Sequence, residues 1–112
     1  MNHVNSPDHS DQAIERMIQA KGLNAPRLKP SDLDDNIVSM EIVKHLSTGG
    51  QVLRWGVLTT KNGFAVTGRP SVAVSPENDN QEIGERVALE NARQELWPLM
   101  GYALKEKLHV SG

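Results

Sequence analysis

The sequence contains no cysteine, and this absence excludes disulfide bonds, thiolate nucleophiles and cysteine-based zinc sites. It also contains no run of about 18 apolar residues, so we expect no segment that spans a bilayer. The first ten residues have neither a basic region nor an apolar stretch, so we expect no secretory signal. Together these absences predict a protein of the cytoplasm.

Aromatic side chains and excess positive charge are both scarce. Aromatic residues make up 4% of the 112 residues, which is few for a platform on which nucleotide bases stack. There are 12 Lys and Arg against 14 Asp and Glu, whereas sequence-independent DNA binding relies on a basic excess. We therefore do not expect nucleic-acid binding. The hydrophobic fraction of 38% fits one globular domain with a single core.

Catalytic signatures are also missing. The sequence contains no Gly-rich phosphate loop, no H-E-x-x-H motif and no G-x-S-x-G motif. A metal cage needs three or four ligands from ordered backbone, whereas His3, His9 and His109 lie toward the ends of the chain. The glutamates near the C-terminal end are interspersed with arginines, which is typical of a charged helix face. We expect no catalytic residue, no metal site and no cofactor.

The N-terminal third of the chain predicts a tail and two short helices. Residues 1–10 are expected to form a disordered tail, and residues 11–108 a single domain. Apolar residues at positions i, i+3 and i+4 predict a helix from Asp11 to Gly22. A linker with two prolines follows, and then a second short helix near residues 32–38. The aspartates of this second helix fit its positive N-terminal end better than they fit a metal site.

Three β-strands with tight turns between them are predicted next. The segments rich in β-forming residues are 40–47, 51–60 and 64–74. Gly49-Gly50 and Asn62-Gly63 are each expected to form a two-residue hairpin loop, and Asn-Gly favours a type I′ turn. Pro70 has no N–H group, so the third strand should lie at an edge of the sheet or carry a bulge.

The two predicted loops set a register that divides the sheet into two faces. Opposed residues share a face and successive residues alternate between faces. One face is expected to form the apolar core, and its residues are Met40, Ile42, Leu46, Leu53, Trp55, Val57, Phe64 and Val66. The opposite face is polar, with Arg54 expected between His45 and Ser71.

The polar face is the candidate binding site. Its residues are His45, Arg54, Thr67, Arg69 and Ser71. Two guanidinium groups and nearby hydroxyl groups suit the geometry of a carboxylate or phosphate group, so a small anionic ligand such as a signalling nucleotide is one interpretation. The other interpretation is the solvated face of an ordinary antiparallel sheet. The sequence leaves both open.

A long helix is expected to begin after Asn80. An apolar stripe along it contains Gly84, Ala88, Ala92, Leu96, Leu99 and Ala103. An unbroken helix to Leu108 would be about 43 Å long at 1.5 Å per residue, which exceeds the width of a compact chain of this size. We therefore expect a kink near Trp97-Pro98. We also expect a homodimer, because Ile83 and Val87 lie off the stripe and a free sheet edge can pair with a second copy.

Several short motifs carry a resemblance to a known family. They are Asn62-Gly63-Phe64, Val66-Thr67-Gly68, Ser75-Pro76-Glu77-Asn78, Glu82-Ile83-Gly84, Glu90-Asn91-Ala92 and Trp97-Pro98-Leu99-x-Gly101-Tyr102. In these motifs the chain resembles, over about residues 11–108, the small tailed-phage family named for gene 49 of one coliphage and gene 66 of another. The resemblance implies a phage or prophage accessory protein that acts in the host cytoplasm. It supplies no catalytic residues, and Arg69-Pro70 departs from the family's pattern.

We therefore expect an α+β fold: two short N-terminal helices, a three-stranded antiparallel meander, and a long C-terminal helix across the apolar face of the sheet. The leading functional hypothesis is a non-enzymatic binding module that acts on a host protein or other host component. The alternative is a binder of a small anionic ligand that uses the polar sheet face.

Overall fold

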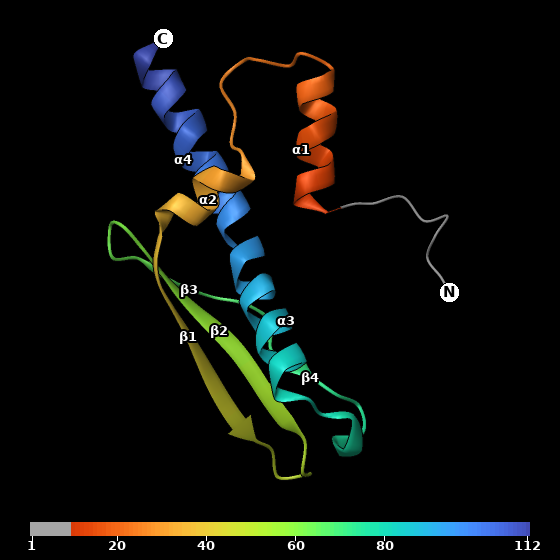
Figure 1. The fold of residues 1–112 in the computed structure, drawn as a ribbon. Helices are drawn as coiled ribbons and strands as arrows, with labels where there is room; N and C mark the ends of the chain where they lie inside the picture. Colours follow the sequence, from red (N-terminus) through yellow and green to blue (C-terminus); the bar gives the residue numbers. More distant parts are fainter. Residues whose placement is uncertain (1–9) are drawn as a thin grey trace.

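The computed structural model describes residues 10–112 and has the expected α+β fold (Figure 1). Its elements are α1 (Asp11–Ala20), α2 (Pro30–Asn36), β1 (Ile37–Leu46), β2 (Val52–Thr60), β3 (Ala65–Thr67), β4 (Ser71–Val72), the 3₁₀ turn η2 (Pro76–Asn78), α3 (Gln81–Gln94) and α4 (Leu96–Ser111). The N-terminal tail expected over residues 1–10 lies outside the described residues, apart from Ser10. The Ser10 hydroxyl caps α1 by accepting a hydrogen bond from the backbone N–H of Ala13.

The sheet is an antiparallel meander with β2 in the middle. β1 pairs with one edge of β2, and both β3 and β4 pair with the other edge. Val57 pairs with Thr67 and Arg54 pairs with Ser71, so three residues of the third strand lie opposite two residues of β2. The extra residue makes a β-bulge over residues 68–70. The predicted place of Pro70 at an interrupted edge is therefore confirmed.

The first hairpin loop has three residues, whereas two were predicted. The backbone N–H of Ser47 donates to the carbonyl oxygen of Gln51 at 2.8 Å, and the N–H of Gly50 donates to the carbonyl of Ser47 at 3.0 Å. Gly50, the last residue of the loop, has a φ of 91°. This is a β-turn followed by a left-handed glycine, the usual geometry of a three-residue hairpin loop.

The second hairpin repeats this geometry. The N–H of Gly63 donates to the carbonyl of Thr60 at 2.9 Å, and the N–H of Thr60 donates to the carbonyl of Phe64 at 3.0 Å. Gly63 has a φ of 89°, but the φ of Asn62 is not positive, so the predicted type I′ turn was wrong. The Asn62 side chain instead accepts a hydrogen bond from the Thr60 hydroxyl at 2.7 Å.

The added loop residue exchanges the two faces of β2. Lys44 lies opposite Arg54, where the shorter loop had placed His45, and Met40 lies opposite Leu58. Because side chains alternate, a shift of one residue moves a whole set of side chains to the other face. The predicted core was therefore wrong on β2, and Met40, Leu46 and Phe64, which were also predicted to lie in the core, are exposed. Arg54, Gly56, Leu58 and Thr60 are buried against α3, and Leu53, Trp55 and Val57 face the other side.

The predicted apolar stripe on the long helix is confirmed along α3 and at Leu96, whereas Leu99 and Ala103, which lie farther along α4, are exposed. Ala88, Ala92 and Leu96 are fully buried, and α3 lies directly on the sheet. A Cβ atom on Gly68 would lie 2.3 Å from the backbone nitrogen of Ala92, and one on Gly56 would lie 3.0 Å from the carbonyl oxygen of Ala88. Small residues on both layers thus allow the close approach.

The core lies between the sheet, α2 and the junction of α3 and α4. Its buried cluster consists of Leu33, Leu58, Val66, Ala92 and Leu96. All of it lies on one face of the sheet, so the protein has two layers.

The long C-terminal helix bends by 23° where α3 meets α4. Glu95 separates the two segments, and Pro98 follows three residues later. The proline ring crowds the carbonyl of Gln94 and offers it no N–H, so the predicted kink near Trp97-Pro98 is confirmed. Beyond the bend, α4 projects past α2 and away from the sheet (Figure 1). No helix in the described residues is long and apolar enough to cross a membrane.

Candidate functional site

The structure brings together only part of the predicted anion site. Arg54 and Ser71 lie opposite each other on the face that α3 covers. His45 and Thr67 pair with odd-numbered residues of β2 and therefore lie on the other, uncovered face. Arg69 lies in the bulge and is exposed. The expected single polar face was wrong because the two hairpin loops are each one residue longer than predicted.

Arg54 is a buried cation whose two Nη groups are engaged in the fold, whereas its Nε is buried without a hydrogen-bond partner. Its side chain is 3% exposed, and it forms a bidentate ion pair with Asp79, with Nη1–Oδ1 at 2.7 Å and Nη2–Oδ2 at 3.0 Å. This hydrogen bonding lowers the pKa of Asp79 and raises the pKa of Arg54. Gly84 makes room for it, because a Cβ there would lie 2.7 Å from Nη1. Arg54 therefore ties the loop before α3 to the sheet.

Ser71 also connects the sheet to the segment around the start of α3. Its hydroxyl donates a hydrogen bond to the carbonyl oxygen of Gly84 at 2.7 Å. This bond joins β4 to the first turns of α3, beside the Arg54 ion pair. Neither Ser71 nor Arg54 is available to a ligand without breaking a contact between the two layers.

Arg69 is the predicted site residue that remains available. Its guanidinium group has no hydrogen bond or ion pair within the described part of the chain, and its backbone carbonyl accepts a hydrogen bond from Asn91 at 3.0 Å. A pocket of about 350 Å³ lies beside it, between the bulge and the start of α3. Asn78 and Asn80 also line this pocket. The pocket thus offers one free cation and amide groups to a small ligand.

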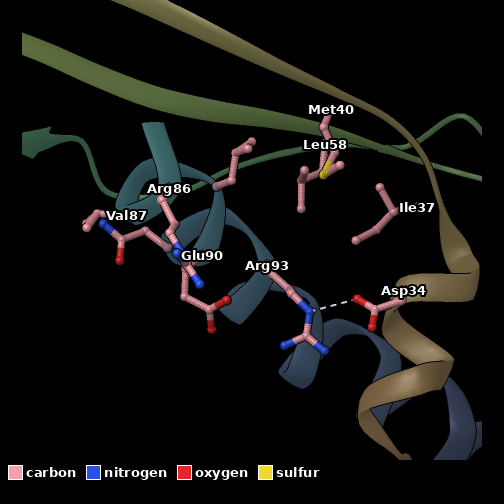
Figure 2. A pocket seen from close by; sticks show the side chains of 10 residues that line it. Asp34, Ile37, Met40, Leu58, Arg86, Val87, Glu90 and Arg93 are labelled. Carbon is pink, nitrogen blue, oxygen red and sulfur yellow. Dashed lines mark hydrogen bonds and ion pairs between the residues drawn. The ribbon is translucent and has the colours of Figure 1, made fainter. Parts of the chain in front are cut away.

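A larger groove lies between β1 and α3 (Figure 2). Its volume is about 500 Å³, and its floor is formed by Ile37, Met40 and Leu58. Arg86 and Glu90 project from α3 at its rim. One end is closed by α2, where Asp34 accepts a hydrogen bond from Arg93 Nε at 2.9 Å. The groove is mainly apolar and exists because α3 lies over β2 and leaves β1 largely uncovered.

The face of the sheet opposite α3 is the third candidate surface, which we call the open face. Its apolar side chains are Val43, Leu53, Trp55, Val57 and Val72. Val43 is 37% exposed and Val72 is 48% exposed, whereas Trp55 is half-buried among its neighbours. Within the described residues, the helix that crosses the sheet, α3, lies on the other face.

Sequence reasoning missed Asp79 as the partner of Arg54, and it missed the open face. A signal for the open face existed in the loops, because Thr48-Gly49-Gly50 and Lys61-Asn62-Gly63 each fit a three-residue loop that ends in a left-handed glycine. No local signal joined Arg54 to Asp79, since 25 residues separate them.

Comparison with models of protein families identified a family that this chain matches. The model of a family described as phage protein (N4 Gp49/phage Sf6 gene 66) matches residues 28–108. The matched segment runs from α2 into α4 and includes the whole sheet, whereas α1 precedes it. No curated protein and no solved structure matches the chain.

Proposed function

The chain belongs to the phage protein (N4 Gp49/phage Sf6 gene 66) family, and we propose that it is a phage or prophage accessory protein that binds a host protein in the host cytoplasm without catalysis. The observation that supports binding is the open face. It presents a tryptophan among valines and leucine on the uncovered side of a two-layer fold. Aromatic anchors surrounded by aliphatic side chains are typical of the centre of protein interfaces.

The polar residues around this surface give it a suitable rim. Glu41 and His45 lie on β1, and Thr67 lies on β3, all on the open face. An apolar centre with a polar, solvated rim is the usual anatomy of a protein interface. Both Nη groups of the buried Arg54 are engaged by Asp79, which supports a structural role for this pair rather than a catalytic one.

Affinity capture from host lysate with two matched variants tests this proposal. Val57→Lys places a charge at the centre of the open face, whereas Gln81→Lys adds the same charge on the exposed first turn of α3. We expect the wild type and Q81K to retain the same host protein, and V57K to lose it at least tenfold. Circular dichroism checks that V57K is folded. Equal retention by all three proteins, or no specific retention by any, contradicts the proposal.

A second candidate function is the binding of a small anionic ligand at the Arg69 pocket. The supporting observation is that Arg69 is exposed beside a pocket of about 350 Å³ and is not engaged by other described residues. A nucleotide at 100 times its Kd should stabilise the fold by about 2.7 kcal/mol. Thermal unfolding with a panel of cyclic and linear nucleotides measures this shift.

Two variants test whether Arg69 binds the ligand. Arg69→Ala removes a positive charge from the pocket, and Lys107→Ala is the matched control that removes a positive charge from the exposed part of α4. We expect R69A to abolish the shift and K107A to keep it. A shift that survives R69A, or no shift with any nucleotide, excludes this second function.

A further inference from the structure

The two edges of the sheet are built differently. One edge consists of β3 and β4, which have three and two residues and are separated by the bulge at Gly68-Arg69-Pro70. Short strands, bulges and prolines are devices that prevent further strand pairing. The other edge is β1, a strand of ten residues without proline. Its pairing with β2 is regular from Ser39 to Leu46, after an irregularity between Ile37 and Ser39, and no described element pairs with its outer side (Figure 1).

The hydrogen-bonding groups on the outer side of β1 can be assigned from the first hairpin. Ser47 and Gln51 form a bonded pair at the end of β1 and β2. Bonded and non-bonded pairs alternate along an antiparallel ladder. The odd-numbered residues of β1 therefore bond with β2. The N–H and C=O groups of Met40, Ile42, Lys44 and Leu46 point to the free edge.

The side chains at this edge are unusually apolar for a solvated strand. Val38 is 60% exposed, Met40 is 62% exposed and Leu46 is 65% exposed. Met40 also lines the groove between β1 and α3 (Figure 2). An uncovered edge beside an apolar groove is typical of a surface that is buried in an assembly.

We propose that a second copy of this chain pairs antiparallel with β1, so that the two sheets join into one. In this pairing, the outward-pointing N–H and C=O groups of one copy bond with those of the other copy. Because opposed residues in a sheet share a face, this places α3 of both copies on the same side of the joined sheet. The two grooves then lie between the two α3 helices and are covered on their open side.

Charge and apolar matching select the register of this pairing. With Val43 on the two-fold axis, Met40 of one copy lies opposite Leu46 of the other, and Glu41 lies opposite His45. With Glu41 on the axis, the Glu41 carboxylates of the two copies would lie opposite each other, and like charges directly opposite are unfavourable. Lys44 lies opposite an apolar residue with either Val43 or Ile42 on the axis, but with Ile42 there Glu41 would lie opposite Val43 and would lose its pairing with His45. Of these three registers, the Val43 register is the one that places Glu41 opposite His45, two groups of complementary character, and it also pairs the exposed residues Met40 and Leu46.

A proline substitution separates backbone pairing from side-chain effects. Lys44→Pro removes an outward N–H but leaves the hydrogen bonds between β1 and β2, because proline is tolerated where an edge N–H faces solvent. Lys44→Ala is the matched control that keeps the N–H. By light scattering, we expect wild type and K44A at twice the 12.3 kDa mass of one chain, and K44P at the mass of one chain. A monomeric wild type, or a K44P dimer as stable as the wild type, overturns the proposal.

Single cysteine substitutions test the register, because the chain contains no other cysteine. They also test the pairing of the two β1 strands if K44P fails to fold. At the axis, the two Val43 Cα atoms would lie about 4.5 Å apart as a non-bonded pair, within the range for a disulfide. The two Glu41 residues would lie about 13 Å apart along the strand. We expect V43C to form a covalent dimer on mild oxidation and E41C not to form one. Crosslinking of E41C without V43C would overturn the inference.

Discussion

The ion pair between Arg54 and Asp79 is the most consequential contact at the scale of single residues. A guanidinium group that is 3% exposed loses its hydration, and the carboxylate of Asp79 replaces it with two hydrogen bonds. The pair joins β2 to the loop before α3, so it fixes one layer of the fold against the other. Removing one partner would leave a buried charge without compensation.

Asp79→Asn should therefore destabilise the protein strongly. Loss of one partner of a buried pair leaves the other unpaired and costs about 3 kcal/mol. Urea unfolding at pH 7 measures the change in the free energy of unfolding. The control is Glu77→Gln, which makes the same charge change at an exposed residue in the same loop. A D79N variant as stable as E77Q would contradict the role assigned to the pair.

The pair also predicts how stability depends on pH. The pKa of Asp79 is lowered in the folded protein from its ordinary value of 3.8, chiefly by hydrogen bonding from Arg54. A lowered folded pKa gives stability that is fully present above the unfolded value and is lost as pH falls through the folded value. We expect the wild type to lose stability below about pH 4 more steeply than D79N. Unfolding curves between pH 2 and 7 provide the comparison.

At the scale of secondary-structure elements, the two hairpins share one design. Each is a three-residue loop whose last residue is a glycine at a φ near 90°, Gly50 at 91° and Gly63 at 89°. The left-handed region is costly for residues with a Cβ atom, so these glycines fix the loop length and with it the strand register. The register in turn decides which face of β2 meets α3.

Gly63→Ala should cost about 1 kcal/mol, because alanine is strained at this φ. Gly49→Ala is the matched control, since a Cβ at Gly49 meets no atom within 4 Å and its φ is not positive. Chemical unfolding of both variants measures the difference. Equal stability of G63A and G49A would show that the loop tolerates a different geometry.

α1 is weakly packed against the rest of the protein. Ala13 is its one buried residue in the described structure, and the Glu15 carboxylate is held by a bidentate ion pair with Arg27 at 2.7 and 2.9 Å. Hydrogen bonds from Arg27 and Gln19 lower the pKa of Glu15 from 4.5 to about 2. This ion pair joins α1 to the loop that follows it, and a second ion pair, between Asp11 and Arg93, joins α1 to α3.

Acid should accordingly release α1 before the rest of the fold. Because the folded pKa of Glu15 is lowered, the stabilisation from the ion pair is present above pH 4.5 and is lost as pH falls toward 2. We expect hydrogen–deuterium exchange of α1 amides, corrected for the intrinsic rate, to accelerate in this window before that of β2. Glu15→Gln should show the faster exchange at pH 7 as well. Uniform protection of α1 and β2 down to pH 2 would contradict this prediction.

At the scale of the whole molecule, the protein is a thin plate with a small core. Its extents are 53 × 40 × 18 Å, and its radius of gyration of 17.1 Å exceeds the value of about 13 Å typical of a compact domain of 100 residues. Among residues 10–112, all helix packing on the sheet is on one face, and the buried cluster has five residues. A monomer of this shape buries a modest share of its apolar surface, and association with a second copy would add to it.

The melting temperature should therefore rise with protein concentration, since a dimer is stabilised by mass action. We expect the wild-type Tm to increase between 1 and 100 μM, to a degree set by the dimer affinity, and the Tm of K44P to stay constant. Differential scanning calorimetry over this range measures both. A concentration-independent wild-type Tm would indicate that the fold is stable as a monomer.

Local sequence signals determined the class of the fold and the order of its elements. The apolar stripe of α3, the bulge at Pro70 and the bend before Pro98 each depend on residues within a few positions of one another, so they could be predicted. The tertiary structure decided which face of β2 is buried. Both faces of β2 carry apolar residues, such as Trp55 and Leu58, so alternation alone could not choose between them.

Which residues form the candidate sites depended on which face of β2 is buried under α3. Arg54 was predicted as a free ligand-binding group, but in the fold it lies under α3 and meets Asp79, which is 25 residues away. His45 and Thr67 were separated from it for the same reason. Sequence determined what each segment becomes, because backbone preferences act over short range. Only the packing of α3 on one face of the sheet decided which side chains are buried and which form a surface, because that packing joins residues from distant parts of the chain.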